Sequence, residues 1–266
     1  MDLPVSEEDL RVALRARLDG GGRIFAPYVT GGLPSVDAEL LRGVAKAGAD
    51  AIEVGIPFSD PVMDGGVIQT ASRLALEAGA TPGKVLETIA EAAIDVPVLV
   101  MTYLNPIHAH GEETFLREAV EAGVSGVIVP DLPVDEASGW IEACFAASVA
   151  PVFLAAPGTN EERLRDIAAA SRGFVYCVAT YGVTGERSTL EETSRALVAA
   201  LRPVATEPLI VGVGIGTPEQ ATEACGFADG VAVGTALMRA LLEEGADAML
   251  ARASAFRDAV PLGARA

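Results

Sequence analysis

Residues 51–78 have the sequence AIEVGIPFSDPVMDGGVIQTASRLALEA. Its first four residues, Ala51–Val54, form a short run that predicts a β-strand and is apolar except for Glu53. A segment containing Pro and Gly follows, and Val67–Ala78, rich in Ala and Leu, then predicts a helix. The stretch therefore predicts one strand, one loop and one helix in that order.

The same order recurs along the whole chain. Short apolar runs predict eight strands, at Ile24–Tyr28, Ala51–Val54, Val98–Met101, Gly126–Val129, Pro151–Leu154, Phe174–Val178, Leu209–Val213 and Gly230–Val233. Helical segments between and after them are predicted at Val36–Ala47, Val67–Ala78, Glu112–Ala122, Asp135–Ala147, Glu161–Ala170, Leu190–Leu201, Pro218–Ala224 and Thr235–Glu244.

These repeated units predict an α/β fold with a parallel sheet. The runs are apolar on both faces, which is typical of parallel strands covered by crossover helices. Eight units in 266 residues, with no linker between them, match one (β/α)8 TIM barrel domain over residues 1–266. A doubly wound sheet is the alternative. Val5–Leu18 predicts an extra N-terminal helix that closes the bottom of the barrel, and Ser6 with Asp9 predicts its cap.

Charge and composition exclude several classes of function. The chain has 37 acidic and 19 basic residues and a net charge of -18. Such a surface repels nucleic-acid phosphates and anionic lipid, so neither is an expected partner. The apolar runs are far shorter than the ~20 residues of a membrane span, and residues 1–19 lack the features of a secretory signal. Cys144, Cys177 and Cys225 form no CxxC pair, which predicts free thiols in a cytoplasmic protein.

Acidic residues follow the second predicted strand. In a barrel of this kind the catalytic groups lie at the carboxyl ends of the strands. Glu53 occupies such an end, where burial would raise its pKa toward the range useful for proton transfer. The alternative is a structural carboxylate bonded to backbone amides. Asp60 and Asp64 lie in the loop that follows, which is long enough to fold over the barrel mouth, although loop acids are usually solvated or capping.

Glycines gather after three later strands. The segments are Tyr181–Gly185, Gly212–Pro218 and Gly234–Thr235, the last of which opens a helix. Glycine lets backbone amides approach an anion closely, and a helix N-terminus adds a partial positive charge. Barrels that bind phosphate hold it at the loops after strands seven and eight. The three segments together predict a phosphate site, whereas each alone could serve a purely conformational role.

Other chemistries lack their side chains. Lys46 and Lys84 are the only lysines and lie away from strand ends, so a Schiff-base nucleophile is not expected. His108 and His110 are the only histidines and have no obvious third ligand, so no metal site is predicted. Acid–base chemistry by carboxyl groups on a small phosphorylated substrate remains. Aromatic side chains near strand ends, which would suit a planar group in that substrate, are Phe58, Tyr103 and Tyr176.

Several longer segments resemble one enzyme family, the tryptophan synthase alpha chain. They run in family order from about Ile24 to Gly234, almost the whole chain. The matching segments are Pro27–Pro34, Ile52–Pro61 with Asp64-Gly65 and Ile68-Gln69, Asn105-Pro106, Pro130-Asp131-Leu132-Pro133, Gly182–Gly185 and Val213–Gln220. Several such matches in order are far more specific than any single glycine loop.

The resemblance implies a carbon–carbon lyase of tryptophan biosynthesis that cleaves indole-3-glycerol phosphate into indole and glyceraldehyde 3-phosphate. It implies that Glu53 is the general acid–base, that Asp64 assists at the indole nitrogen, and that neither a metal nor an organic cofactor is used. The substrate-binding residues that it implies are Tyr176 near the reacting centre, Thr184 in a mobile loop, and Gly185, Gly214, Gly234 and Thr235 around the phosphate.

The resemblance also implies a partner, the pyridoxal-phosphate beta chain, in an alpha2beta2 heterotetramer. The loop Thr102–His108 and the segment Pro57–Asp60 would meet it, unless that loop is only a lid over the protein's own site. Two other functions stay open at this point. One is a stand-alone lyase with the same catalytic residues, and the other is a non-catalytic barrel that binds a phosphorylated ligand.

Overall fold

The computed structural model describes residues 6–178 and 187–263. Within these ranges nine parallel strands form one sheet in the order β5-β4-β3-β2-β1-β9-β8-β7-β6. The strands are β1 (Ile24–Thr30), β2 (Ile52–Gly55), β3 (Val98–Met101), β4 (Val124–Ile128), β5 (Ala150–Val152), β6 (Leu154–Ala155), β7 (Val175–Val178), β8 (Leu209–Gly212) and β9 (Gly230–Val233).

The sheet closes on itself at Phe153. Strands β5 and β6 are the two ends of the sheet order, and this one residue separates them in the chain. The amide of Tyr176 on β7 donates to the carbonyl of Phe153 at 3.0 Å, so hydrogen bonding continues across the interruption. The predicted (β/α)8 barrel is therefore confirmed, and the doubly wound alternative is wrong. The fifth predicted strand, Pro151–Leu154, is divided into β5 and β6.

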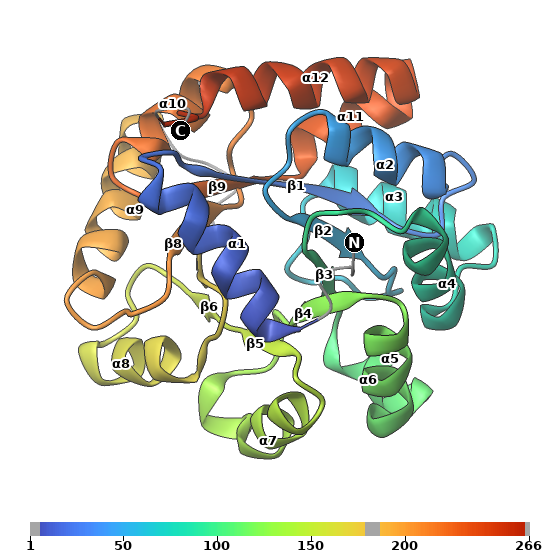
Figure 1. Ribbon diagram of the computed structural model, residues 1–266, viewed down its shortest axis with the longest axis horizontal. Coiled ribbons are helices and arrows are strands. Elements are labelled where there is room, and N and C mark those ends of the chain that lie inside the picture. Colours follow the sequence, from blue (N-terminus) through green and yellow to red (C-terminus); the bar gives the residue numbers. More distant parts are fainter. Residues whose placement is uncertain (1–5, 179–186, 264–266) are drawn as a thin grey trace.

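Helices surround the strands (Figure 1). They are α1 (Glu7–Asp19), α2 (Ala38–Lys46), α3 (Gly66–Glu77), α4 (Pro82–Ala92), α5 (Leu104–His110), α6 (Glu112–Glu121), α7 (Ser138–Ala146), α8 (Glu161–Ala170), α9 (Arg187–Leu201), α10 (Pro218–Cys225), α11 (Thr235–Glu244) and α12 (Ala246–Ala259), with a short 3-10 helix η1 (Val134–Glu136). None of the helices in the described ranges has the length and apolar character to cross a membrane.

Three of these helices, α4, α5 and α12, were not among the predicted segments. Thr102–His108, which the sequence predicts to be a loop, instead contains most of α5. This helix has only seven residues, includes Pro106, and has no side-chain cap at its own N-cap residue, Tyr103. The local sequence therefore lacks the usual signals of a helix, and a tertiary contact supplies the cap.

Helix α1 closes the amino-terminal end of the barrel, as predicted. The Ser6 hydroxyl accepts a hydrogen bond from the Asp9 amide and donates one to the Asp9 carboxylate, which caps the helix. Leu10 and Leu14 are fully buried in the apolar cluster inside the barrel. In Figure 1 the helix lies across the ring of strands. The substrate end of the barrel must therefore be the opposite one.

Side chains alternate between two apolar layers. On β1, Ile24 and Ala26 belong to the cluster inside the barrel, whereas Phe25 and Val29 belong to the cluster between sheet and helices. Successive residues of a strand point to opposite faces, so Tyr28 points inward. On β2 the neighbours of Glu53, Ile52 and Val54, pack outward, which directs Glu53 into the barrel.

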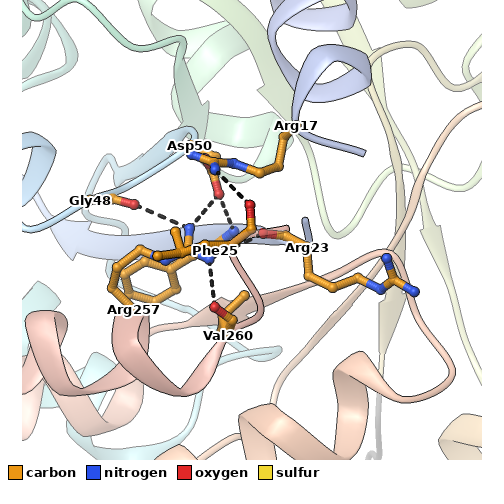
Figure 2. Close-up of polar contacts among 8 residues, drawn as sticks. Arg17, Arg23, Phe25, Gly48, Asp50, Arg257 and Val260 are labelled. Carbon is orange, nitrogen blue, oxygen red and sulfur yellow. Dashed lines mark hydrogen bonds and ion pairs between the residues drawn. The ribbon is translucent and has the colours of Figure 1, made fainter. Parts of the chain in front are cut away.

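A buried carboxylate ties the bottom of the barrel together (Figure 2). Asp50, just before β2, accepts hydrogen bonds from Arg17 Nε of α1 at 2.6 Å and from Arg257 Nη1 of α12 at 2.7 Å. It also accepts the amide of Phe25 on β1 at 2.9 Å. Arg257 continues outward, donating to the carbonyl of Val260 at 2.9 Å. One carboxylate thus links β1, the start of β2, α1 and α12.

We expect Asp50→Asn to destabilise the fold by about 3 to 5 kcal/mol, because it keeps the shape but leaves Arg257 buried without its counter-ion. The control is Glu77→Gln, which breaks an exposed pair with Arg73 and should change the free energy of unfolding by less than about 1 kcal/mol. Urea unfolding at pH 7 measures both variants. Equal stability of the two variants would show that the Asp50 network is dispensable.

Candidate active site

The carboxyl ends of the strands form the barrel mouth, where Glu53 lies. In the register of the sheet it is level with Tyr28 on β1 and with Leu99 on β3. Its side chain is 1% exposed, and neither carboxyl oxygen has a hydrogen-bond partner within the residues that the structure describes. Burial raises the pKa of Glu53 to about 8. The structural alternative, a carboxylate bonded to backbone amides, is therefore wrong for the described part of the chain.

Asp64 reaches the mouth from the loop between β2 and α3. Burial raises its pKa to about 6, and a hydrogen bond from the Tyr103 hydroxyl acts in the opposite direction. The same hydroxyl accepts the amide of Met63 at 2.9 Å, and the Tyr103 ring packs against Phe58 with the ring centroids 5.3 Å apart. Tyr103 was predicted only as aromatic surface. In the structure its hydroxyl also holds the backbone of the loop next to Asp64, through the amide of Met63.

Two inward phenols, Tyr28 and Tyr176, flank Glu53. A Cβ at Gly55 would overlap the Tyr28 hydroxyl, and one at Gly212 would overlap the Tyr176 hydroxyl, so both positions need glycine. Burial, and then the charges of nearby acids, raise the pKa of both phenols well above the usual value. For Tyr176 the charge of Glu53, the predicted acid–base, has the larger effect of the two.

Tyr28 was missed as a site residue, although one signal could have found it. It lies two residues after Ala26 and four after Ile24, on the inward side of the first strand, and the strand ends two residues later. A polar group at such a position faces the mouth. The hydroxyl of Thr30 donates to the Tyr28 hydroxyl at 3.3 Å, so the phenol is held from the same strand.

A cavity of about 70 Å³ lies at the mouth. That volume suffices for a few water molecules. Its lining includes Tyr28, Asp64, Tyr176, Val213, Gly214, Gly234 and Thr235, from four strand ends and the loop before α3. Gly234 precedes α11 and offers no side-chain cap, and Gly214 has a φ of 100°. The cavity therefore brings the acidic residue Asp64 beside the predicted phosphate-binding glycines.

Val213 adds an apolar side chain to this lining. Its φ is 64°, a left-handed conformation that a β-branched residue rarely adopts, and its side chain is 42% exposed. Core packing therefore does not account for the residue at this position. The side chain is free to contact a ligand in the cavity.

The structure brings together most of the predicted site residues. Asp64, Tyr176, Gly214, Gly234 and Thr235 line the cavity, and Glu53 lies among the same phenols. Thr184 and Gly185 lie outside the described residues. Within the described ranges no three His, Cys, Asp or Glu side chains are grouped as metal ligands. His110 instead contacts Glu118, with its Nε2 2.7 Å from the carboxylate.

The family model for the tryptophan synthase alpha chain matches residues 15–260. The chain belongs to this family. The alpha chain of Streptomyces avermitilis is 44% identical over 232 residues, which cover 86% of this chain and 83% of the relative. That of Streptomyces coelicolor is 43% identical over 248 residues, which cover 92% and 88%. The resemblance noted in the sequence is confirmed.

Solved tryptophan synthase structures share the barrel. A Mycobacterium tuberculosis tryptophan synthase in space group F222 superposes with a TM-score of 0.88 at 36% identity, covering 96% of this chain and 98% of that one. The alpha subunit from Legionella pneumophila gives 0.86 at 32% identity, covering 96% and 98%. The tryptophan synthase alpha fold therefore extends over nearly the whole chain.

Glu53 gives the stability of this alpha chain a distinctive dependence on pH. Its carboxyl group holds a proton in the folded state up to about pH 8, whereas the unfolded chain releases it near pH 4.5. The folded state then binds more protons than the unfolded one, so stability falls as pH rises across that window, by up to about 1.4 kcal/mol per pH unit. The decline levels off only as the pH rises beyond the folded-state pKa of about 8.

We expect Glu53→Gln to remove this decline, since glutamine does not titrate. Urea unfolding at pH 5, 6, 7 and 8 compares the two proteins. Asp64, whose pKa is also raised, titrates in both of them and so cancels in the difference. Parallel stability curves for wild type and variant would show that Glu53 has an ordinary pKa.

Proposed function

We propose that Glu53 and Asp64 together cleave indole-3-glycerol phosphate into indole and glyceraldehyde 3-phosphate, the lyase step of tryptophan biosynthesis. The observation that carries the proposal is the pair of carboxyl groups at the mouth, one without a partner in the described residues and one bonded to a phenol. Family membership supports it, since the curated relatives are named tryptophan synthase alpha chains.

The two carboxyl groups differ in protonation at pH 7. With a pKa of about 8, Glu53 is mainly protonated and can donate a proton. With a pKa of about 6, Asp64 is mainly ionised, and the Tyr103 hydroxyl favours that ionised form. Because their surroundings separate the two pKa values, Glu53 can serve as the acid and Asp64 as the anion.

A protonated Glu53 beside an ionised Asp64 suits a retro-aldol reaction. Carbon C3 of indole is a poor leaving group until a proton is added to it, which converts the ring to an indolenine. Glu53 supplies this proton, and the carboxylate of Asp64 stabilises the positive charge that develops at the ring nitrogen. Glu53, now ionised, accepts the proton of the glycerol hydroxyl as the carbon–carbon bond breaks. One residue with a pKa near neutrality thus serves both transfers.

The opposite side of the cavity suits the substrate phosphate. Helix α11 has ten residues and begins at Thr235 with no side-chain cap, so its first amides and partial positive charge are available to an anion. Gly234 and Gly214 line the same cavity. We assign phosphate binding to Gly214, Gly234 and Thr235 together with Gly185, and contact with the substrate near the reacting centre to Tyr176 and Thr184.

We expect Glu53→Gln to lower the kcat of indole release at least ~10²-fold, the contribution usual for general acid–base catalysis, with little change in KM. Asp64→Asn should also be severely impaired, because the neutral amide cannot stabilise a cation. The control is Asp166→Asn, an exposed acid on the outer helix α8. Rates for Glu53→Gln within a few-fold of wild type would contradict the assignment.

The partner in this proposal is the tryptophan synthase beta chain, in an alpha2beta2 assembly in the cytoplasm. Three free, buried cysteines support a reducing compartment. Much of the region expected to contact the partner packs inside the chain itself, since Tyr103, Ile107 and Pro57 are buried. The exposed part of that region consists of Asn105 and His108 on α5 and of Ser59 and Asp60. Val62, two residues beyond it, is 78% exposed beside a groove against α3.

We expect indole release by the isolated chain to be slow and to accelerate on addition of a beta chain from the same source. If the partner binds the closed state of the site with higher affinity than the open state, its binding shifts the equilibrium toward the closed state by the same factor. Val62→Asp should weaken the complex, measured by light scattering at micromolar concentration. Val12→Asp is the matched control, because Val12 is also exposed but lies on α1 at the far end of the barrel. Fast release by the isolated chain, with no complex detected, would favour a stand-alone lyase.

A further inference from the structure

The segment Pro130-Asp131-Leu132-Pro133 has no role in the reaction described above, although it is among the family-like motifs. The structure gives Asp131 a specific contact. Its Oδ1 accepts the amide of Leu104 at 3.0 Å, from a position 27 residues further along the chain. Leu104 is the first residue of α5, and Tyr103, the N-cap, makes no side-chain cap of its own. Asp131 therefore caps α5 from the loop after the neighbouring strand β4.

The residue adjacent to this capped amide is Tyr103, which contacts the catalytic loop. Its hydroxyl accepts the amide of Met63, the residue before Asp64, at 2.9 Å, and its proximity to Asp64 opposes the rise in the pKa of that carboxyl group. Its ring packs on Phe58. The charge of Asp131 is also among the causes that raise the pKa of Tyr103, which places the two groups close together. A continuous set of contacts thus runs from Asp131 through the start of α5 to Asp64.

We propose that Asp131 is a positioning residue of the active site, which caps α5 across the mouth and thereby holds Tyr103 against the loop that carries Asp64. This inference rests on the proposed role of Asp64 in the lyase reaction. Helix α5 has seven residues, too few to be stable alone, so the direction of its first turn depends on tertiary contacts. The cap from Asp131 is the side-chain contact that the structure shows at its first amide.

A second aspartate shows what capping alone would do. Asp37 accepts the amide of Leu40 at 2.9 Å and caps α2, with an exposed carboxylate like that of Asp131. Asp37 is the N-cap of the helix it caps, and α2 lies on the outside of the barrel, packed against α4 and α12. Removing Asp37 therefore removes a cap of the same kind without touching Tyr103 or Asp64.

The proposal predicts a particular change with pH. The bond from Tyr103 favours the ionised form of Asp64, so a looser Tyr103 raises the pKa of that carboxyl group. Because Asp64 acts as an anion, the acid limb of the kcat profile should move to higher pH. The titratable groups that face Asp64 and its phenol from the neighbouring elements are Glu53 on β2, Tyr28 on β1, Tyr176 on β7, Tyr103 after β3 and Asp131 after β4.

The test compares Asp131→Ala, Asp131→Asn and Asp37→Ala by steady-state indole release from pH 5 to 9. We expect Asp131→Ala to lower kcat about tenfold, the usual effect of losing one hydrogen bond to a charged group, and to shift the acid limb upward. Asp131→Asn keeps the acceptor oxygen and should restore kcat to within about threefold of wild type. Asp37→Ala should leave kcat and the acid limb unchanged. Equal profiles for the two alanine variants would overturn the proposal.

A double-mutant cycle tests whether Asp131 acts through Tyr103. In a Tyr103→Phe background the hydroxyl is absent, so adding Asp131→Ala should lower kcat no further. If the two substitutions lower kcat by independent factors that multiply in the double variant, Asp131 does not act through the Tyr103 hydroxyl and the proposal is overturned.

A measurement without substrate separates this inference from the proposed function. The carboxyl carbon of Asp64, observed by NMR in protein labelled with 13C-aspartate and assigned with Asp64→Asn, should titrate at higher pH in Asp131→Ala than in wild type or Asp37→Ala. If the wild type releases no indole but this shift is present, the proposed function fails and the positioning role stands. If the wild type is active and the shift is absent, the positioning role fails.

Discussion

The carboxylate of Asp50 holds the amino-terminal end of the barrel together. It accepts donors from α1, α12 and β1, and so ties elements from both ends of the chain to the start of β2. Together with the buried leucines of α1 it makes this end a closed structural floor. Among residues 6–178 and 187–263, the carboxyl ends of the same strands carry no such floor, which leaves them available for a site.

Three residues beyond Asp50, strand β2 carries an acid, Glu53, in the opposite environment. Asp50 is surrounded by donors, whereas the oxygens of Glu53 have no partner among the described residues. A buried charge is tolerated only when it is paired, so Asp50 serves the fold as a paired anion while Glu53 is held mainly protonated near neutral pH. The proposed acid–base chemistry depends on this absence of hydrogen-bond partners for Glu53 among the described residues, because burial without them keeps its pKa high.

The mouth is assembled from loops that contact one another. Tyr103 after β3 bonds to the loop after β2, and Asp131 after β4 caps the helix that follows Tyr103. The loop after β2 is thus held by the segment after β3, and that segment by the loop after β4. Asp64 is therefore placed both by its own turn, in which its amide donates to the carbonyl of Pro61, and by the contact of Tyr103 with Met63.

By itself the sequence determined the eight strand positions, the barrel, the capped α1 and the candidate acids, because apolar periodicity and strand-end position are local properties of the chain. It also carried the family motifs. Only the tertiary structure decided that Pro151–Leu154 is interrupted at Phe153, that Thr102–His108 contains a helix, and that the Tyr28 hydroxyl occupies the space beside Gly55. The physical reason is the same in each case: burial, a cap from another strand or a missing Cβ depends on which distant residues the closed barrel brings together.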